Sequence, residues 1–165
     1  MTRITRIVKW QEGAESLLHT DLTTVATTPA DIDRLWHADL TELCRTQNAI
    51  GLAANQVGVK QNFFFVAGGA KLLPTSLGQI CICPGWEPRR ASRRKPMVEG
   101  CKSLDGAYVV ERWLAIDVVW TSMNGHRIER ALKGLAAQVF QHEHDHLCGI
   151  TLMDSGRKIE PDSAL

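Results

Sequence analysis

Apolar residues recur with helical spacing in two parts of this chain. Between residues 29 and 47 they follow one another at intervals of three and four, and Thr28 precedes Pro29 as a candidate N-cap, so we predict a helix from Pro29 to Gln47. A second helix is predicted around Gln138 to Gly149, and its last glycine is well placed to end it in a left-handed cap. The apolar positions are Ile32, Leu35, Trp36, Leu40, Leu43 and Cys44 in the first helix, and Leu135, Ala136, Val139, Phe140 and Leu147 in the second.

Shorter apolar runs predict strands. The segment from Phe63 to Ala67 is typical of a buried strand before a turn at Gly68 and Gly69, and the segment from Gln79 to Cys83 is a second candidate. Residues 114–120 and 127–132 alternate as strands around a turn at Asn124 and Gly125. We expect the arm of residues 1–28 to dock loosely through Ile4, Ile7, Val8, Leu17, Leu18 and Leu22, and the polar tail after Met153, including residues 155–165, to be loose.

Composition changes this outline little. With 165 residues, of which 44% are hydrophobic and 22% charged, the chain fits one globular domain over residues 1–165. A formal net charge of +1 argues against binding DNA through the whole surface. No apolar run approaches the roughly 18 residues of a membrane span, and five cysteines form no disulfide framework. We therefore expect a cytoplasmic protein without a membrane partner.

The second predicted helix carries the candidate chemistry. His142 and His146 are four residues apart, so their imidazoles lie on one helix face and can bind one metal ion, with Glu143 beside it. A catalytic site of this kind needs a third protein ligand and an open position for water. The alternative is an amphipathic helix with surface histidines, which the apolar neighbours disfavour. His144 is expected to face solvent or to support the ligands.

Three further segments leave alternatives open. Cys81 and Cys83 are better interpreted as buried thiols than as a metal pair, because no second cysteine pair accompanies them. Cys101 is the thiol that we would bring to the metal, although an inert buried thiol fits equally well. Gln56, in the small-residue run from Ala49 to Gly58, offers amide donors or simply closes a tight loop.

The five basic residues between Pro88 and Pro96 could contact RNA. A solvated hairpin tip is the commoner meaning of such a run, and we favour it here.

Three segments of the chain, taken in order, resemble the three motifs of peptide deformylases: AIGLAANQ, EGCKS and QHEHDHLCG. The resemblance covers nearly the whole chain. It implies an α+β fold with antiparallel β-sheets around a central metal-binding helix. It also implies removal of the N-formyl group from the initiator formyl-methionine of nascent polypeptides, with release of formate.

The resemblance assigns roles residue by residue. It makes Cys101, His142 and His146 the metal ligands, and Glu143 the general acid/base for a metal-bound water that attacks the formyl carbon. A thiolate ligand softens the site and permits one divalent ion of several kinds, with zinc, nickel or cobalt possible in purified protein. The resemblance implies iron(II) as the native ion. The remaining implied roles are oxyanion donors at Gln56 and the Lys102 N–H, peptide binding by the main chain at Ile50 and Gly51, and a methionine pocket lined by Ile50, Leu135, Val139 and the base of His142.

The chain departs from the family pattern at several positions. Ala49 replaces a glycine, Lys102 an apolar residue, and Asp105 a common proline. The C-terminal helix of many bacterial members has no counterpart, so ribosome docking through it is not expected, although a transient ribosome contact stays possible. A compact viral form would have these features, and its location would be the host-cell cytoplasm. We expect a monomer, and a pair between Arg112 and Asp145 behind the metal helix.

Two rival interpretations remain. A zinc metallopeptidase would need a third ligand downstream, for which Glu160 is the candidate. A catalytically silent relative is disfavoured, because every residue to which the resemblance assigns a catalytic or metal-binding role is present.

Overall fold

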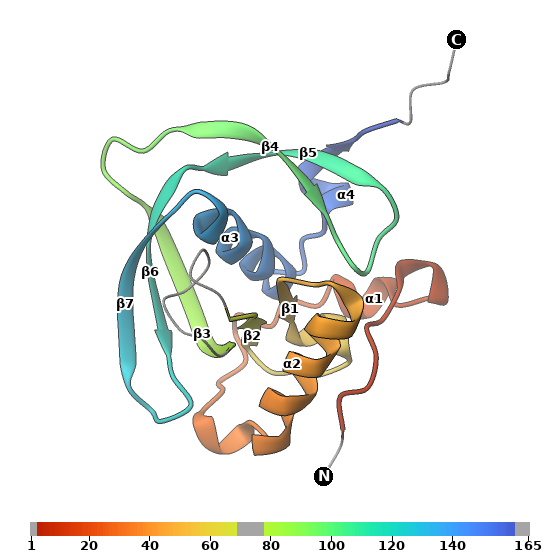
Figure 1. The fold of residues 1–165 in the computed structure, drawn as a ribbon, viewed down its shortest axis with the longest axis vertical. Helices are drawn as coiled ribbons and strands as arrows, with labels where there is room; N and C mark the ends of the chain where they lie inside the picture. The colour runs from red at the N-terminus through yellow and green to blue at the C-terminus, as the bar shows by residue number, and fades with distance from the viewer. Residues whose placement is uncertain (1–2, 69–77, 161–165) are drawn as a thin grey trace.

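The computed structural model describes residues 3–68 and 78–160, and Figure 1 shows their arrangement. The strands are β1 (Gly51–Ala53), β2 (Phe63–Val66), β3 (Gln79–Pro88), β4 (Arg94–Gly100), β5 (Ala107–Trp113), β6 (Ala115–Thr121), β7 (Arg127–Lys133) and β8 (Gly156–Lys158). The α-helices are α1 (Glu15–Leu18), α2 (Arg34–Gln47), α3 (Leu135–Leu147) and α4 (Leu152–Ser155). Three 3-10 helices are η1 (Trp10–Glu12), η2 (Pro29–Asp31) and η3 (Ala54–Val57).

The described strands form two antiparallel sheets. The first has the order β1-β2-β3-β6-β7 and the second the order β4-β5-β8, so β1 and β4 are both edge strands. Helix α3 contacts β1, β2, β3 and β7 of the first sheet and β5 of the second. The predicted α+β fold, with antiparallel sheets around one central helix, is confirmed.

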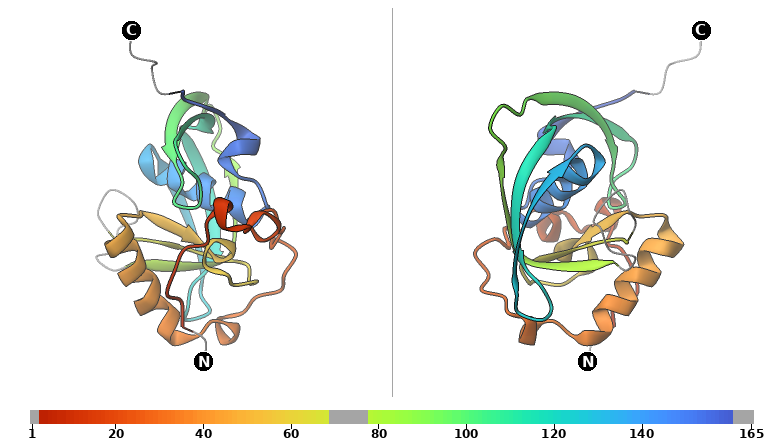
Figure 2. Two further views of the ribbon diagram at one scale, coloured as in Figure 1. Left: turned by 90° about the vertical axis from the view of Figure 1, so that its right-hand side faces the viewer. Right: turned by 60° about the vertical axis from the view of Figure 1, so that its left-hand side comes forward.

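The phenylalanine run in β2 explains why this strand is buried on both faces. Phe63 stacks on Trp36 of α2, and Phe65 packs edge-on against His37 of the same helix. Phe64, between them, points the other way and packs edge-on against Phe140 of α3. Because side chains alternate along a strand, three consecutive aromatic residues attach helices to both faces of the sheet. Figures 1 and 2 accordingly show α2 and α3 on opposite sides of β1, β2 and β3.

The N-terminal arm is attached more firmly than expected. Ile4, Ile7, Leu18 and Leu22 are buried in the core. The buried carboxylate of Asp39 accepts a hydrogen bond from the Ile4 N–H (2.9 Å) and pairs with the Arg3 side chain. The arm therefore docks through both apolar packing and a buried charge.

The first predicted helix starts later than its pattern indicates. Thr28 and Pro29 begin the short helix η2, in which the Asp31 carboxylate accepts a hydrogen bond from the Thr28 N–H. Ile32 is extended, and α2 then starts with Asp33 as N-cap, whose carboxylate accepts from the Leu35 N–H (2.9 Å). Two competing caps thus divide one apolar periodicity into two helices.

Several strand expectations also need correction. Strands β2, β6 and β7 are confirmed, as is the turn at Gly125, where φ is +77°. The predicted strand at 79–83 continues to Pro88 past a bulge between Ile82 and Gly85. Cys81 is buried as expected, whereas Cys83 is exposed because it lies in this bulge with φ +47°. Gly69 lies outside the described residues.

The basic run is not a hairpin tip. Strand β3 pairs with β6 and β4 pairs with β5, so residues 89–93 connect two different sheets. The tail was also expected to be loose, but Gly156–Lys158 pairs with β5. A Cβ at Gly156 would lie 2.8 Å from Val110 Cγ2, so the missing side chain is what lets this strand approach.

Candidate metal centre and active site

Helix α3 and the end of β4 bring three candidate ligands together. His142 and His146 lie one turn apart on α3, and Cys101 follows the last residue of β4. The Cys101 Sγ is 3.2 Å from His146 Nε2, and the ligand atoms of all three residues lie within 4.8 Å of one another. One thiol and two imidazoles at this separation suit a borderline-soft divalent ion such as zinc or iron(II). The residues therefore fit a metal on their own geometry.

A buried carboxylate orients one of these imidazoles. Glu99 Oε2 lies 2.9 Å from His142 Nδ1, which leaves His142 Nε2 as the ring nitrogen available for a metal. Arg112 in turn donates two 2.9 Å hydrogen bonds to the Glu99 carboxylate, and it also pairs with Asp145. Burial opposes ionisation of Glu99, but Arg112 and His142 outweigh it and lower its pKa to about 2. The expected pair of Arg112 with Asp145 is present, and the 6% exposure of the arginine side chain shows that it is no surface pair.

The ionisation of Cys101 reflects the same clustering. Burial alone would raise the pKa of its thiol, but the neighbouring His146 and His142 lower that pKa well below its ordinary value. A thiolate is the form of cysteine that binds metals. The electrostatics of the cluster thus favour the state of Cys101 that a metal centre requires.

Glu143 lies beside the candidate ligands without taking part in their contacts. Its side chain is almost fully buried, and its Oε2 has no hydrogen-bond partner among the described residues. Burial raises the pKa of this carboxyl to about 7, although both histidines partly offset the effect. A buried carboxylate without a partner is costly unless something else binds it, so Glu143 is suited to receive a proton from a bound molecule.

Gln56 also contacts the thiol of Cys101. Its Oε1 accepts the Ala53 N–H (2.9 Å), which fixes the direction of the amide. The Nε2 group therefore points toward Cys101 Sγ (3.3 Å) and Ser103 Oγ (3.2 Å). Helix η3 thus serves to present two amide hydrogens to the candidate centre, and the idea that Gln56 only closes a local loop does not account for these contacts.

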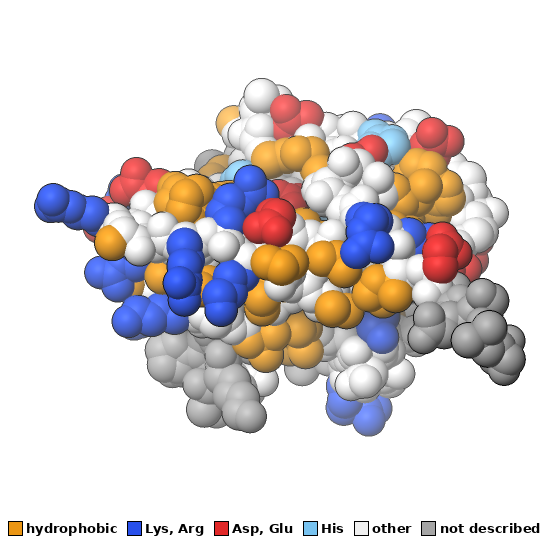
Figure 3. All heavy atoms as spheres, turned by 90° about the horizontal axis from the view of Figure 1, so that it is seen from above, with side chains coloured by type: hydrophobic (Ala, Val, Ile, Leu, Met, Phe, Trp, Pro, Cys, Tyr) orange, Lys and Arg blue, Asp and Glu red, His pale blue; other side chains and the backbone are white. Residues whose placement is uncertain are grey.

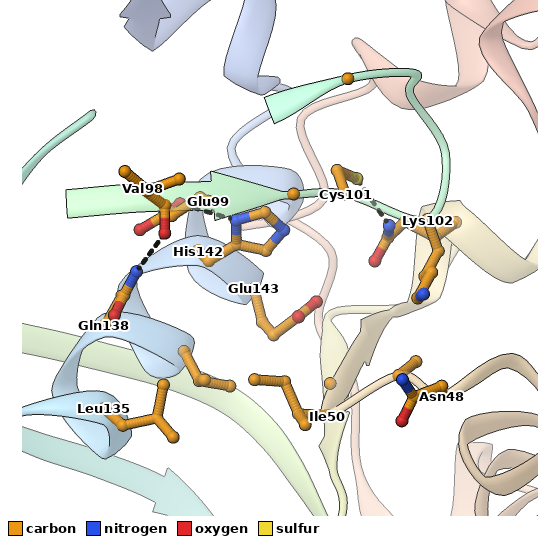
Figure 4. A pocket seen from close by; sticks show the side chains of 16 residues that line it. Asn48, Ile50, Val98, Glu99, Cys101, Lys102, Leu135, Gln138, His142 and Glu143 are labelled. Carbon is orange, nitrogen blue, oxygen red and sulfur yellow. Dashed lines mark hydrogen bonds and ion pairs between the residues drawn. The ribbon is translucent and has the colours of Figure 1, made fainter. Parts of the chain in front are cut away.

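A cavity of about 540 Å³ opens onto this cluster. Figure 4 shows Glu143 and His142 between the end of β4 on one side and Ile50 on the other, with Leu135 at the start of α3; Lys102 and Asn48 also line the cavity. Every site residue that the sequence predicts lines this cavity except His146, which is buried directly beside Cys101. The predicted members of the lining are Ile50, Gly51, Gln56, Cys101, Lys102, Leu135, Val139, His142 and Glu143.

Sequence reasoning missed other residues at the cavity. Glu99, Val98 and Gln138 line it as well, and Gln138 Nε2 donates to the Val98 carbonyl (3.3 Å). Glu99 stands two residues before Cys101, and an acidic residue so close to a candidate ligand is the signal that could have identified it. Val98 and Gln138 carry no such signal, because only the fold brings β4 against α3.

Neither His144, which was expected to face solvent or to support the ligands, nor Glu160, the alternative ligand, belongs to the group of candidate metal ligands. Within residues 3–68 and 78–160, the one group of three that could hold a metal is Cys101, His142 and His146. His144 is half-buried between Trp86 and Cys148, and Glu160 is exposed. The third ligand expected for a metallopeptidase is therefore replaced by a cysteine. None of the helices in those residues has the length and apolar character that a membrane crossing needs.

Comparison with known proteins agrees with this geometry. A peptide deformylase of Aquifex aeolicus is 35% identical over 117 residues, which cover 70% of this chain and 68% of that protein. The crystal structure of the Thermotoga maritima peptide deformylase superposes with a TM-score of 0.76 at 27% identity, covering 97% of this chain and 100% of the other. A probable peptide deformylase from Synechococcus phage S-SSM7 gives 0.75 at 26% identity, covering 92% and 99%. The family model for polypeptide deformylase matches residues 4–162, and the chain belongs to that family.

Proposed function

We propose that this chain removes the N-formyl group from formylmethionyl peptides at a divalent metal held by Cys101, His142 and His146, with Glu143 as the general acid/base. Metal-dependent deformylation is the activity of the family, and its substrates are formylated nascent peptides. The observation that carries the residue assignment is the buried carboxylate of Glu143, whose Oε2 has no hydrogen-bond partner in the described part of the chain, beside a compact Cys-His-His group.

The donor set also bears on the choice of metal. A divalent ion bound there would act as a Lewis acid and supply a water of lowered pKa. We propose iron(II) as the native ion. A thiolate with two imidazoles suits it, and zinc, nickel and cobalt fit the same ligands, so the metal has to be identified by experiment. An iron(II) centre with a thiolate ligand should lose activity in air.

Glu143 would move the proton that the reaction requires. Its carboxylate accepts a proton from the water that attacks the formyl carbon and returns it to the departing amine, which gives formate and a free N-terminus. Burial raises the pKa of this carboxyl in the metal-free protein, which makes its carboxylate a stronger base than that of an exposed glutamate.

Two donors would stabilise the tetrahedral oxyanion. The Gln56 amide group is held toward the thiol by the hydrogen bond to Ala53, and the main-chain N–H of Lys102 follows Cys101 directly. Donors fixed before the reaction starts stabilise developing charge without reorganising. The lysine side chain lines the cavity but is not needed for this role.

The peptide would bind as an added strand. Ile50 and Gly51 line the cavity, and Gly51 begins β1, whose outer edge is free of strand partners in the described sheet. An edge strand can accept an extended peptide through main-chain hydrogen bonds. Leu135, Val139 and Ile50 give that cavity the apolar lining that suits a methionine side chain.

We further propose that the chain acts as a monomer and meets nascent peptides during a transient contact with the ribosome. Figure 3 shows basic side chains gathered at one end of the face that it displays. The exposed basic residues around the β3–β4 connection are Arg90, Arg93, Arg94 and Lys95. Such a group favours an anionic surface in a salt-dependent way.

The test is formate release from formyl-Met-Ala-Ser and from acetyl-Met-Ala-Ser by protein loaded anaerobically with iron(II), zinc, nickel or cobalt. We expect release from the formylated peptide alone, fastest with iron(II), and loss of activity after chelation with recovery on reloading. Metal bound stoichiometrically without formate release would contradict the proposal and would support the silent relative instead.

A further inference from the structure

Three consecutive residues of the N-terminal arm pass between the two segments that carry the candidate oxyanion donors. The Val8 N–H donates to the Gln56 carbonyl (2.8 Å), and the Trp10 N–H donates to the Ser103 carbonyl (2.9 Å). Between them, the Lys9 ammonium donates to the Lys102 carbonyl (2.5 Å). The arm thus holds helix η3 on one side and the loop after Cys101 on the other.

The same loop is held at its far end. Gln11 Nε2 donates to Asp105 Oδ2 (2.6 Å), and the Trp10 ring packs against the small apolar cluster that contains Cys101, Leu104 and Tyr108. Lys102 and Asp105 are two of the positions at which this chain differs from the family pattern. Both are contacted by side chains of the arm, from Lys9 and Gln11 respectively.

The peptide unit between Lys102 and Ser103 links Lys9 to the thiol. Its carbonyl oxygen accepts from the Lys9 ammonium, and its N–H, on Ser103, donates to Cys101 Sγ (3.4 Å). A cation at the oxygen end of a peptide group polarises it and strengthens its N–H as a donor. Because a peptide unit is rigid and planar, fixing the oxygen also fixes the direction of that N–H.

We propose that Lys9 is a positioning residue of the active site, which acts through the Lys102–Ser103 peptide on the Cys101 thiolate and on the neighbouring Lys102 N–H. Lys9 does not touch the reacting atoms. Its ammonium keeps the peptide oriented so that one N–H supports the sulfur while the preceding N–H stays directed for the oxyanion. The inference rests on the proposed deformylase chemistry for its effect on turnover, but its effect on the loop and on the sulfur is independent of it.

The test compares Lys9→Met, which keeps the apolar stem and removes the ammonium, with Lys9→Arg, which keeps a cationic donor. Arg6→Met is the matched control, because Arg6 lies on the same arm and pairs only with the exposed Glu12 among the contacts described. Three experiments are done on each: steady-state kinetics for kcat and KM with formyl-Met-Ala-Ser, hydrogen exchange of the amides of residues 101–105 in metal-free protein, and the sulfur-to-metal absorption band of the cobalt(II) form.

For Lys9→Met we expect kcat to fall about tenfold, which is typical for groups that orient metal ligands, with KM changed less than about twofold. Exchange at residues 101–105 should accelerate and the cobalt(II) band should shift, whereas Lys9→Arg and Arg6→Met should match the wild type in all three. Lys9→Gln, which also lacks the charge, takes the place of Lys9→Met if that variant does not fold.

The proposal is overturned if the uncharged variant matches Arg6→Met in exchange and in the cobalt(II) band. Faster exchange and a shifted band, with no formate release even from the wild type, would uphold the inference about Lys9 and contradict the proposed function instead. A lower kcat with unchanged exchange and an unchanged band would also count against a positioning role.

Discussion

Individual residues at this site act through their nearest neighbours. Gly51 contributes by what it lacks: a Cβ there would lie 2.5 Å from Glu143 Oε1 and 2.8 Å from its Cδ. The sequence predicted both residues from separate motifs but could not show that they touch. Likewise, Gln56 was identifiable as an amide in a run of small residues, yet only the hydrogen bond to Ala53 shows which end faces the thiol.

Gly51→Ala should displace the Glu143 carboxylate. The Gly51 backbone does not have a positive φ, so the fold should tolerate the new side chain. A displacement of about 1 Å at a reacting group can nevertheless lower turnover roughly 100-fold. Steady-state kinetics on formyl-Met-Ala-Ser and thermal melting check this. Gly85→Ala is the control, because its Cβ would meet only Val119 Cγ1 at 3.5 Å. Wild-type kcat in Gly51→Ala would rule out the contact as a constraint.

Gln56→Ala should lower kcat with little change in KM. Removal of one oxyanion donor typically costs about 3 kcal/mol of transition-state stabilisation, or roughly 100-fold in rate. Gln56→Glu keeps an oxygen for the Ala53 N–H but loses the donor, so it should be slow as well while the local fold is retained. A variant of either kind with wild-type turnover would remove Gln56 from the mechanism.

At the level of elements, the helices and buried strands were the predictable part. Helix α3, β2 and β6 have clear apolar patterns, and the structure has them where expected, together with β7. Strand β4 was missed because it is an edge strand with Pro96 and few buried residues. Its partner β5 was missed as well. Strand β1 has only three residues and is defined by its pairing with β2, which no local pattern encodes.

The link between β5 and α3 gives a test at this scale. Arg112 joins Glu99 on β4 to Asp145 on α3, so Arg112→Ala leaves two acidic groups without their partner. Breaking a buried ion pair by removing one partner typically costs about 3 to 5 kcal/mol. We expect a loss of this size in urea denaturation and weaker metal retention, since Glu99 also orients His142. Arg112→Lys should recover part of both, and unchanged stability and activity in Arg112→Ala would contradict the role.

At the level of the whole molecule, the three motifs predicted the family and the α+β fold because each motif is tied to one place in that fold. The contacts of the N-terminal arm could not be predicted in the same way. Lys9, Gln11 and Asp39 are ordinary polar residues in the sequence, and their partners lie 93, 94 and 36 positions away. Only the folded chain brings these partners together.

Asp39→Ala should weaken the attachment of the arm. It leaves the buried Ile4 N–H without an acceptor, which typically costs about 1 to 3 kcal/mol in the free energy of unfolding. The hydrogen bond from Arg3 lowers the pKa of Asp39 in the folded protein. The stability linked to its ionisation is therefore fully present above the unfolded pKa of about 3.9 and is lost as the pH falls through the lower folded pKa. Urea denaturation at pH 7 and below pH 4 should show a difference from wild type that shrinks with acid. Glu42→Ala, which breaks an exposed pair with Arg45, is the control, and an equal effect there would contradict the prediction.

The measurement that tests the central claim most directly is formate release from formyl-Met-Ala-Ser by the wild type and by Glu143→Gln, both with their metal content quantified. Glutamine keeps the size of the side chain but cannot accept the proton. We predict equal metal binding and a turnover lowered about 100-fold or more in the variant. Turnover at the wild-type rate in metal-loaded Glu143→Gln would contradict the assignment of Glu143 as the general acid/base.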